Sequence, residues 1–505
     1  MMKSLQEFLK WFKRRFKKDK VHDKESAQAV SDQKIERSKI EEPALRKEVT
    51  PRAIIRRKEK VYIQVGLDFG TSATKIAYSQ LGGRGRKVNP ILFNHNLPHY
   101  PPYCLPSLAA FDETGKLLLG IEAARFLADK PWDSGLRRFK VIVAGKYDKS
   151  FDDQISIDLY RKYLTQISLN QSDCEPECLT AVFLAFAMKQ ARHEMQRKFS
   201  ECELDMAFNT CIPIDHIQNN EVNNVYQKIL ATAENAEKDN DCNKLLEIVR
   251  EKYKNVEYRS MAPRLFGVPE AVAEIALYLV SLQVRNGLHA VIDFGAGTTD
   301  FSIFYLENIR TRDEQKFWYA ARNLPRGSQR IEYIVSRYMG EISKGENITD
   351  LHVAHATSNI NKLPDDIKNQ IRKELKGLWE DSHAVWGQAY SHRRRQSEWE
   401  GDRVHVLVCG GGAKAPFIKD IFSKSWMKDW GPYPVYPLPI PDDYDSLDGK
   451  ASFERMSVAY GLCQPLPSLG DYTLPNDAPD QTPPRLPIRE MSEWDERIPR
   501  PGWIG

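Results

Sequence analysis

The sequence predicts an α/β fold with two lobes, and two glycine-containing turns and a later glycine run support this prediction. The turns lie in VGLDFGTSATK (Val65–Lys75) and VIDFGAGTTD (Val291–Asp300), and the run VLVCGGGAKAP lies at Val406–Pro416. Each turn follows a strand-like stretch rich in β-branched and aromatic residues, Val61–Leu67 or His289–Ile292. Because the two strand–turn units lie far apart in the chain, we expect one in each lobe.

The chemistry of the turns indicates a site for phosphate and a metal ion. Asp68 and Asp293 end the two strands, and a turn of glycine and hydroxyl residues then directs backbone N–H groups at an anion. Gly70 and Gly295 occur where a side chain would block the approach of a phosphate. The hydroxyl groups that can donate to phosphate oxygens belong to Thr71, Ser72 and Thr298. The two aspartates suit Mg²⁺, which prefers carboxylate oxygen. A single Asp-x-Gly is usually only a turn, but the ordered set of three motifs favours a nucleotide site.

This ordered set resembles the superfamily of actin, sugar kinases and DnaK-type chaperone ATPases. In the resemblance, the first turn is phosphate loop 1, the second is phosphate loop 2, and the glycine run is the adenosine loop. The likeness covers about four-fifths of the 505 residues. It implies a two-lobed actin-like ATPase fold, built from duplicated ribonuclease-H-like domains around a deep nucleotide cleft, with ATP and Mg²⁺ as cofactors.

Within the superfamily, the DnaK type is the most similar. DFGAGTTDFSIF at Asp293–Phe304 has the DxGxGTxDxS form of that group, and the segments Leu105–Phe126 and Asn209–His216 resemble two more of its motifs. Gly267–Leu279 resembles the helix that links the lobes, and Arg455–Cys463 resembles the closing helix. Sugar kinases match less well because no convincing sugar-binding motif is present.

The resemblance also implies the residues of the site. The metal would be held by Asp68 and Asp293. The nucleotide contacts would come from Asp68, Gly70, Thr71, Ser72 and Lys75, from Gly295, Ala296, Gly297 and Thr298, and from Gly410, Gly411, Gly412 and Lys414. Ala296 replaces a glycine of the family, which is tolerable if that position does not need a positive φ. The glycine run would pass flat against the nucleoside, although such a run is also a plain packing device.

Two residues are candidates for catalysis, Lys140 and Glu270. DnaK-type proteins carry a water-positioning glutamate directly before the proline of the linking helix, whereas here Val268 precedes Pro269 and the acid follows as Glu270. Lys140 is either a phosphate-facing group or an ordinary surface lysine. Hydrolysis is therefore expected to be slow, and whether ATP is hydrolysed at all stays open.

Composition divides the chain into five segments. Residues 1–20 read as a basic amphipathic helix, 21–60 as a charged, disordered linker, 61–287 and 288–463 as the two lobes, and 464–505 as a Pro-rich extended tail. The N-terminal helix would align Leu5, Phe8, Leu9, Phe12 and Phe16 on one face with lysines and arginines beside them. Such a helix suits an anionic membrane surface, or docking onto a partner or onto the protein itself.

Bulk properties exclude several classes of protein. A net charge of +4 is too small to indicate a nucleic-acid partner. The eight cysteines form no CxxC pairs or dense framework, which favours reduced thiols, and no apolar run is long enough to cross a bilayer. We therefore expect a cytoplasmic protein, either free or peripheral at the inner membrane surface through its N-terminal helix.

The resulting functional hypothesis is an ATP-binding, chaperone-like protein that acts as a nucleotide-dependent conformational switch for an unknown protein partner. A DnaK-type peptide-binding domain would need well over a hundred residues after the nucleotide-binding body, but only 464–505 remain. The alternative is a membrane-associated actin-like ATPase that forms filaments. A small-molecule kinase would need a substrate pocket that the sequence does not indicate.

Overall fold

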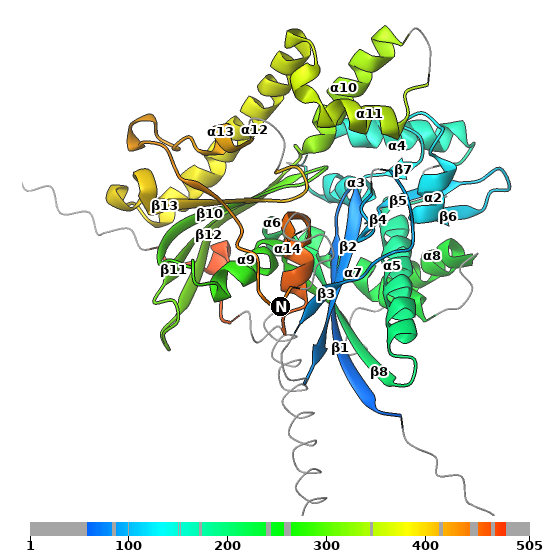
Figure 1. The fold of residues 1–505 in the computed structure, drawn as a ribbon, viewed down its shortest axis with the longest axis horizontal. Helices are drawn as coiled ribbons and strands as arrows, with labels where there is room; N and C mark the ends of the chain where they lie inside the picture. The colour runs from blue at the N-terminus through cyan, green and yellow to red at the C-terminus, as the bar shows by residue number, and fades with distance from the viewer. Residues whose placement is uncertain are drawn as a thin grey trace, which may run out of the picture.

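The computed structural model describes residues 58–82, 87–98, 100–149, 151, 153–170, 174–238, 244–256, 264–343, 347–413, 418–444, 453–465 and 470–480. These residues form a mixed α/β fold with two large sheets and one small sheet (Figure 1). The predicted N-terminal helix, residues 21–57 of the predicted linker, Lys414 and residues 481–505 of the predicted tail lie outside the described residues.

The first large sheet has the order β3-β2-β1-β8-β9, with β4 paired to β2. β1 is antiparallel to β2, and β2 to β3, whereas β1, β8 and β9 run parallel. The predicted strand Val61–Leu67 lies within β1. The bounds are β1 Lys60–Phe69, β2 Ala73–Leu81, β3 Val88–Pro90, β4 Cys104–Pro106, β8 Glu203–Ile212 and β9 Leu265–Pro269.

The second large sheet repeats this topology in the order β12-β11-β10-β13-β14. β10, β11 and β12 are antiparallel, and β10, β13 and β14 run parallel, so each strand has a counterpart in the first sheet. The predicted strands His289–Ile292 and Val404–Val408 lie within β10 and β13. The bounds are β10 Gly287–Phe294, β11 Thr299–Glu307, β12 Gln315–Leu324, β13 Val404–Cys409 and β14 Val435–Pro437.

Helices cover the outer sides of both sheets. In the half built around the first large sheet, called the first half, α5 packs on β8 and α7 on β9. In the second half, built around the second large sheet, α12 packs on β11 and β12. α12 is the longest of these helices and runs to His392. The bounds are α5 Pro176–Lys198, α6 Ile214–Gln218, α7 Asn220–Glu237, α8 Leu245–Asn255, α10 Ser328–Ile342, α11 Asp350–Ser358, α12 Asp365–His392 and α13 Ile418–Phe422.

A small antiparallel sheet, in the order β6-β5-β7, adjoins the first half together with three helices. The bounds are β5 Leu108–Phe111, β6 Leu117–Leu119, β7 Leu136–Arg137, α2 Ile121–Phe126, α3 Phe139–Tyr147 and α4 Gln154–Gln166. This part of the first half contacts the second half directly. Arg137 Nη2 donates to Asp350 Oδ2 at 2.7 Å, and the Trp132 N–H donates to the Ile348 carbonyl at 2.8 Å.

Two helices lie between the large sheets, α9 (Glu270–Val280) and α14 (Phe453–Leu462) (Figure 1). α14 packs on β1, β2 and β8 and also on β13, and α9 packs on β8, β9 and β10. The helices cross so closely that a Cβ at Gly461 would lie 1.7 Å from the carbonyl oxygen of Ala273. A side chain at this crossing would therefore push the helices apart.

The linking helix begins later than the sequence suggested. The expected helix was Gly267–Leu279, but Gly267, Val268 and Pro269 belong to β9, and α9 starts at Glu270. The reason is local, since proline disfavours a helical conformation in the residue before it.

The beginning of the predicted tail packs against β12. The Trp318 N–H donates to the Thr473 carbonyl, and the Thr473 N–H donates to the Lys316 carbonyl, each at 2.9 Å. In the parts of the chain that the structure describes, no helix has the length and apolar character needed to cross a membrane.

Candidate functional site

The candidate site lies where the parallel strands of both sheets end. The carboxyl ends of parallel strands share one edge of a sheet, which is where α/β proteins bind ligands. In the first sheet this edge carries Asp68 of β1 and Cys211 of β8, followed by Glu270 at the start of α9. In the second sheet it carries Asp293 of β10, which pairs in register with Cys409 of β13.

The two predicted phosphate loops face and contact each other. Phe69 pairs with Thr74 and Phe294 with Thr299, so each hairpin closes through a turn of four residues. A Cβ at Gly297 would lie only 2.6 Å from Cγ2 of Thr71. The structure therefore brings together two turns that are more than two hundred residues apart in the sequence.

Neighbouring groups fix the shape of both turns. The Ser107 hydroxyl donates to the Gly70 carbonyl at 2.7 Å, and the Gln329 N–H donates to the Ala296 carbonyl at 2.8 Å. Ala296 does not have a positive φ, so its replacement of a glycine requires no strained backbone. A Cβ at Gly70 would lie 2.5 Å from the Ala73 carbonyl oxygen, so the turn itself requires this glycine.

The glycine run after β13 packs against the second turn. Gly410 has φ +87°, and a Cβ there would lie 2.0 Å from Oδ1 of Asp293. The Gly412 N–H donates to the Phe294 carbonyl at 2.9 Å. Packing thus accounts for Gly410 and Gly412, whereas a Cβ at Gly411 would meet only Arg455 Nε, at 3.8 Å.

Asp68 forms a close ion pair within its own hairpin. Lys75 Nζ donates to Asp68 Oδ2 at 2.6 Å, and the thiol of Cys211 lies 3.6 Å from Asp68 Oδ1. Burial lowers the pKa of Lys75, but the charge and hydrogen bond of Asp68 outweigh this effect and raise that pKa above its ordinary value. Lys75 is therefore a fixed positive charge at the first turn.

The two catalytic candidates contact each other. Lys140 lies on α3, and its Nζ is 3.4 Å from Glu270 Oε2. Both residues are buried, with 8% and 5% of their surfaces exposed, so Lys140 is not a surface lysine. Burial opposes the charge of Lys140, but Glu270 raises its pKa well above the ordinary value. Val268, by contrast, is buried in the core of the first half.

The second turn carries acids without a lysine. Burial, followed by the charge of Glu270, raises the pKa of Asp293 to about 7. Burial likewise raises the pKa of Asp300 and of Glu274, with Glu270 the next cause for Asp300 and Asp293 the next for Glu274. Among the described residues, Oδ1 of Asp293 has no hydrogen-bond partner. The carboxyl groups at this edge of the two sheets therefore outnumber the lysines, an imbalance of charge that a cation would relieve.

One group of side chains in the described residues has the composition and spacing of a metal site. Asp68, Cys211 and Glu270 are all buried, and each offers a ligand atom within 4.8 Å of the other two. Asp293, the other predicted metal ligand, is not part of this group.

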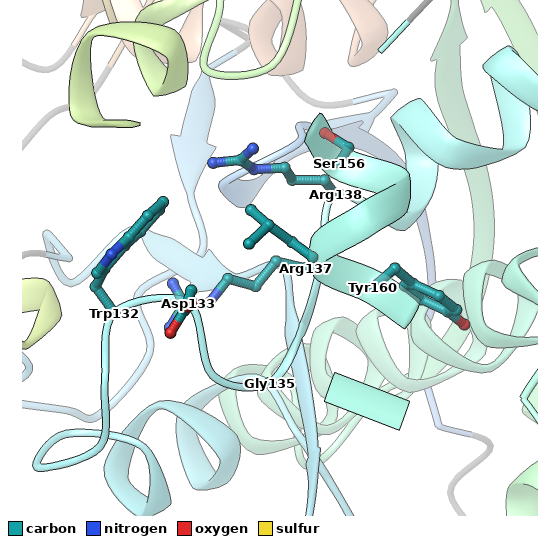
Figure 2. Close-up of a pocket in the computed structure, with 8 residues that line it drawn as sticks. Trp132, Asp133, Gly135, Arg137, Arg138, Ser156 and Tyr160 are labelled. Atoms are coloured by element: carbon teal, nitrogen blue, oxygen red, sulfur yellow. The ribbon is translucent and has the colours of Figure 1, made fainter. Parts of the chain in front are cut away.

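A separate small pocket lies beside the contact between the halves. Figure 2 shows Arg138 and Ser156 above the pocket, Trp132 on one side and Tyr160 on the other. Arg138 has φ 61°, an uncommon conformation for a residue with a side chain, and its Nε lacks a hydrogen-bond partner. None of the site residues inferred from the sequence lines this pocket.

Comparison with known proteins identifies no relative, since no protein-family model and no curated protein matches the chain. Sequence reasoning did not assign Cys211, Glu274 or Asp300 to the site. A signal existed for Cys211, because it lies near the carboxyl end of an apolar, strand-like stretch, as Asp68 and Cys409 do. No local signal marked Glu274, since only the packing of α9 between the sheets turns it towards the cleft.

Proposed function

We propose that the protein is an ATP-binding switch of the actin-like ATPase type, most similar to DnaK-type chaperones, whose halves close on Mg-ATP and report this closure to a protein partner. The observation that carries the proposal is the contact between the two turns, Gly297 against Thr71, at the edges of two sheets with the same strand order. Such a repeat supports the duplicated ribonuclease-H-like arrangement that the sequence resemblance implies.

The residues present fit Mg-ATP. Mg²⁺ prefers carboxylate oxygens and retains several waters. The unpartnered Oδ1 of Asp293 and the nearby Asp68 are suited to such an ion, while Lys75 and Lys140 supply positive charge for phosphate oxygens. When bound, the nucleotide would supply the phosphoryl group, and the metal would neutralise part of its charge.

Glu270 is the residue best placed to orient a water. It is buried at the start of α9, and Lys140 Nζ lies 3.4 Å from its Oε2. The water-positioning glutamate of the family stands directly before the proline, whereas here Val268 precedes Pro269 and the acid comes one residue after it. We therefore propose slow hydrolysis, with Glu270 in place of the glutamate that the family has before the proline.

Calorimetric titration with ATP and Mg²⁺ tests the proposal. Asp293→Asn should weaken the binding of Mg-ATP by about tenfold or more, because the cation loses an oxygen partner. Glu380→Gln, which changes an exposed acid on α12, is the control and should bind as the wild type does. Absence of ATP binding by the full-length wild-type protein would refute the proposal.

A further inference from the structure

The first half carries the thiol of Cys211 beside the predicted Mg²⁺ ligand Asp68, although Mg²⁺ does not bind thiols. Cys211 is the penultimate residue of β8, with 4% of its surface exposed, and its Sγ lies 3.6 Å from Asp68 Oδ1. Glu270 supplies a third ligand atom within 4.8 Å of both. Mg²⁺ selects oxygen ligands, whereas a thiolate selects softer ions such as Zn²⁺.

The spacing of sulfur and oxygen fits a single tetrahedral ion. With a Zn–S bond of about 2.3 Å and a Zn–O bond of about 2.0 Å, a tetrahedral angle separates the two ligand atoms by about 3.5 Å. The separation of Cys211 Sγ and Asp68 Oδ1 is 3.6 Å. One ion can therefore bind both atoms without moving the strands, and rotation of the Glu270 side chain can complete three protein ligands.

The neighbouring lysines leave room for this ion. Lys75 holds Oδ2 of Asp68, which leaves Oδ1 on the side of the thiol. Lys140 contacts only Oε2 of Glu270 at 3.4 Å, a distance that is long for an ion pair. The positive charges of the lysines are balanced by Asp68 and Glu270, and the additional acids Asp293 and Asp300 nearby favour a further cation.

We propose that Asp68, Cys211 and Glu270 form a binding site for a thiophilic divalent cation, of which Zn²⁺ is the expected ion. As the metal–sulfur bond forms, the S–H bond breaks and its proton passes to the solvent. The site itself does not depend on nucleotide. Where the proposed ATPase function holds, the ion occupies Asp68 and Glu270, and Zn²⁺ therefore inhibits turnover.

Cobalt(II) tests the site, because a cobalt–thiolate bond produces a charge-transfer absorption band that oxygen ligands do not produce. The full-length reduced protein is titrated with Co²⁺ in the absence of nucleotide. We expect the band to saturate at one equivalent, to disappear when Zn²⁺ is added, and to persist when Mg²⁺ is added. Cys211→Ser should abolish the band.

Cys409 provides a matched control from the second half. It occupies the corresponding place beside Asp293, is equally buried, and lies outside the three-residue group. Cys409→Ser should keep the band, and Glu270→Gln should weaken Co²⁺ binding by at least about tenfold. Circular dichroism of each variant checks the fold, and Cys211→Ala replaces Cys211→Ser if the serine variant does not fold.

A wild-type protein without the band, or a band that survives in folded Cys211→Ser, would overturn the proposal. ATP binding measured separately by calorimetry is unaffected by these outcomes, so failure of the metal site is distinct from failure of the proposed function.

Discussion

Each half contains the same hairpin, but the charged residues that pair across the two hairpins differ. In the first hairpin, Asp68 pairs in register with Lys75, whereas in the second, Asp293 pairs in register with Asp300. The backbone geometry is shared, since both turns have four residues, but one contains a neutral ion pair and the other two acids with raised pKa values. The comparison shows that a repeated fold can keep the same backbone hairpin while one copy carries an ion pair and the other carries two buried acids.

The largest effect should follow loss of the lysine in the first hairpin. Lys75→Met leaves the buried Asp68 carboxylate without its partner, which costs about 3–5 kcal/mol. Urea unfolding at pH 7 measures the free energy of unfolding. The control Lys376→Met removes an exposed pair with Glu380 and should cost less than about 1 kcal/mol. Equal losses in the two variants would mean that the first hairpin does not depend on its ion pair.

Turnover should depend strongly on the first half. If Glu270 orients the attacking water, Glu270→Gln should slow ATP hydrolysis by about a hundredfold, with little change in ATP affinity, because the amide cannot accept a proton. Single-turnover kinetics and calorimetry measure the two quantities separately. An unchanged rate would assign the chemistry to another acid, with Asp293 of the second half the first to test.

Acid should destabilise the second half in particular. Burial, followed by the charge of His405, lowers the pKa of His289 on β10 to about 3, whereas the corresponding position of β1 holds Gln64. The unfolded chain binds a proton at His289 below pH 6.5, but the folded chain does so only near pH 3. The stability of the folded chain is therefore unaffected by His289 above pH 6.5. Between pH 6.5 and about 3 it falls by about 1.4 kcal/mol per pH unit, because only the unfolded chain takes up the proton.

Replacing His289 with glutamine, the residue at the corresponding position of β1, isolates this effect. His289→Gln should lose the contribution, so the stability difference between wild type and variant should shift by about 1.4 kcal/mol per pH unit below 6.5. Urea unfolding at pH 7, 6 and 5 provides the comparison. A difference that is constant with pH would show that His289 does not titrate as its burial implies.

The smallest effect is expected at Asp300. Burial raises the pKa of Asp300 well above its ordinary value, which favours the neutral carboxyl group, and Asn is a close substitute for that form. Asn323 Nδ2, which lies 3.0 Å from Asp300 Oδ1, can still donate to the amide oxygen. Asp300→Asn should therefore change the free energy of unfolding by about 1 kcal/mol or less. A loss as large as that of Lys75→Met would mean that the second hairpin also relies on a charged pair.

Much of this arrangement could be predicted because local patterns encode it. β-branched runs that end in turn residues predict the strands before Asp68 and Asp293 and the turns after them. The same pattern predicts the strand before Gly410. These elements form as expected because their sequence preference agrees with their place in the sheets.

What the sequence could not predict depends on register and packing between distant segments. The closeness of Cys211 to Asp68 follows from the alignment of β8 with β1, and the contact of Lys140 with Glu270 from the packing of α3 near α9. The start of α9 was misjudged because Gly267–Pro269 continues the apolar pattern of the helix while forming a strand. Side-chain periodicity over so few residues does not distinguish the two.

The crossing of α9 and α14 sets the mechanics of any movement between the halves. At Gly461 and Ala273 the two backbones touch without intervening side chains, so sliding is blocked there and rotation is the motion that remains. We expect this crossing to be the pivot of such a rotation. The contact of Arg137 on β7 with Asp350 at the start of α11 lies away from this crossing (Figure 1), so a rotation at the crossing changes the distance between β7 and α11. The two halves are thus joined at two separate places, and a rotation about the crossing would have to break or strain the ion pair of Arg137 with Asp350.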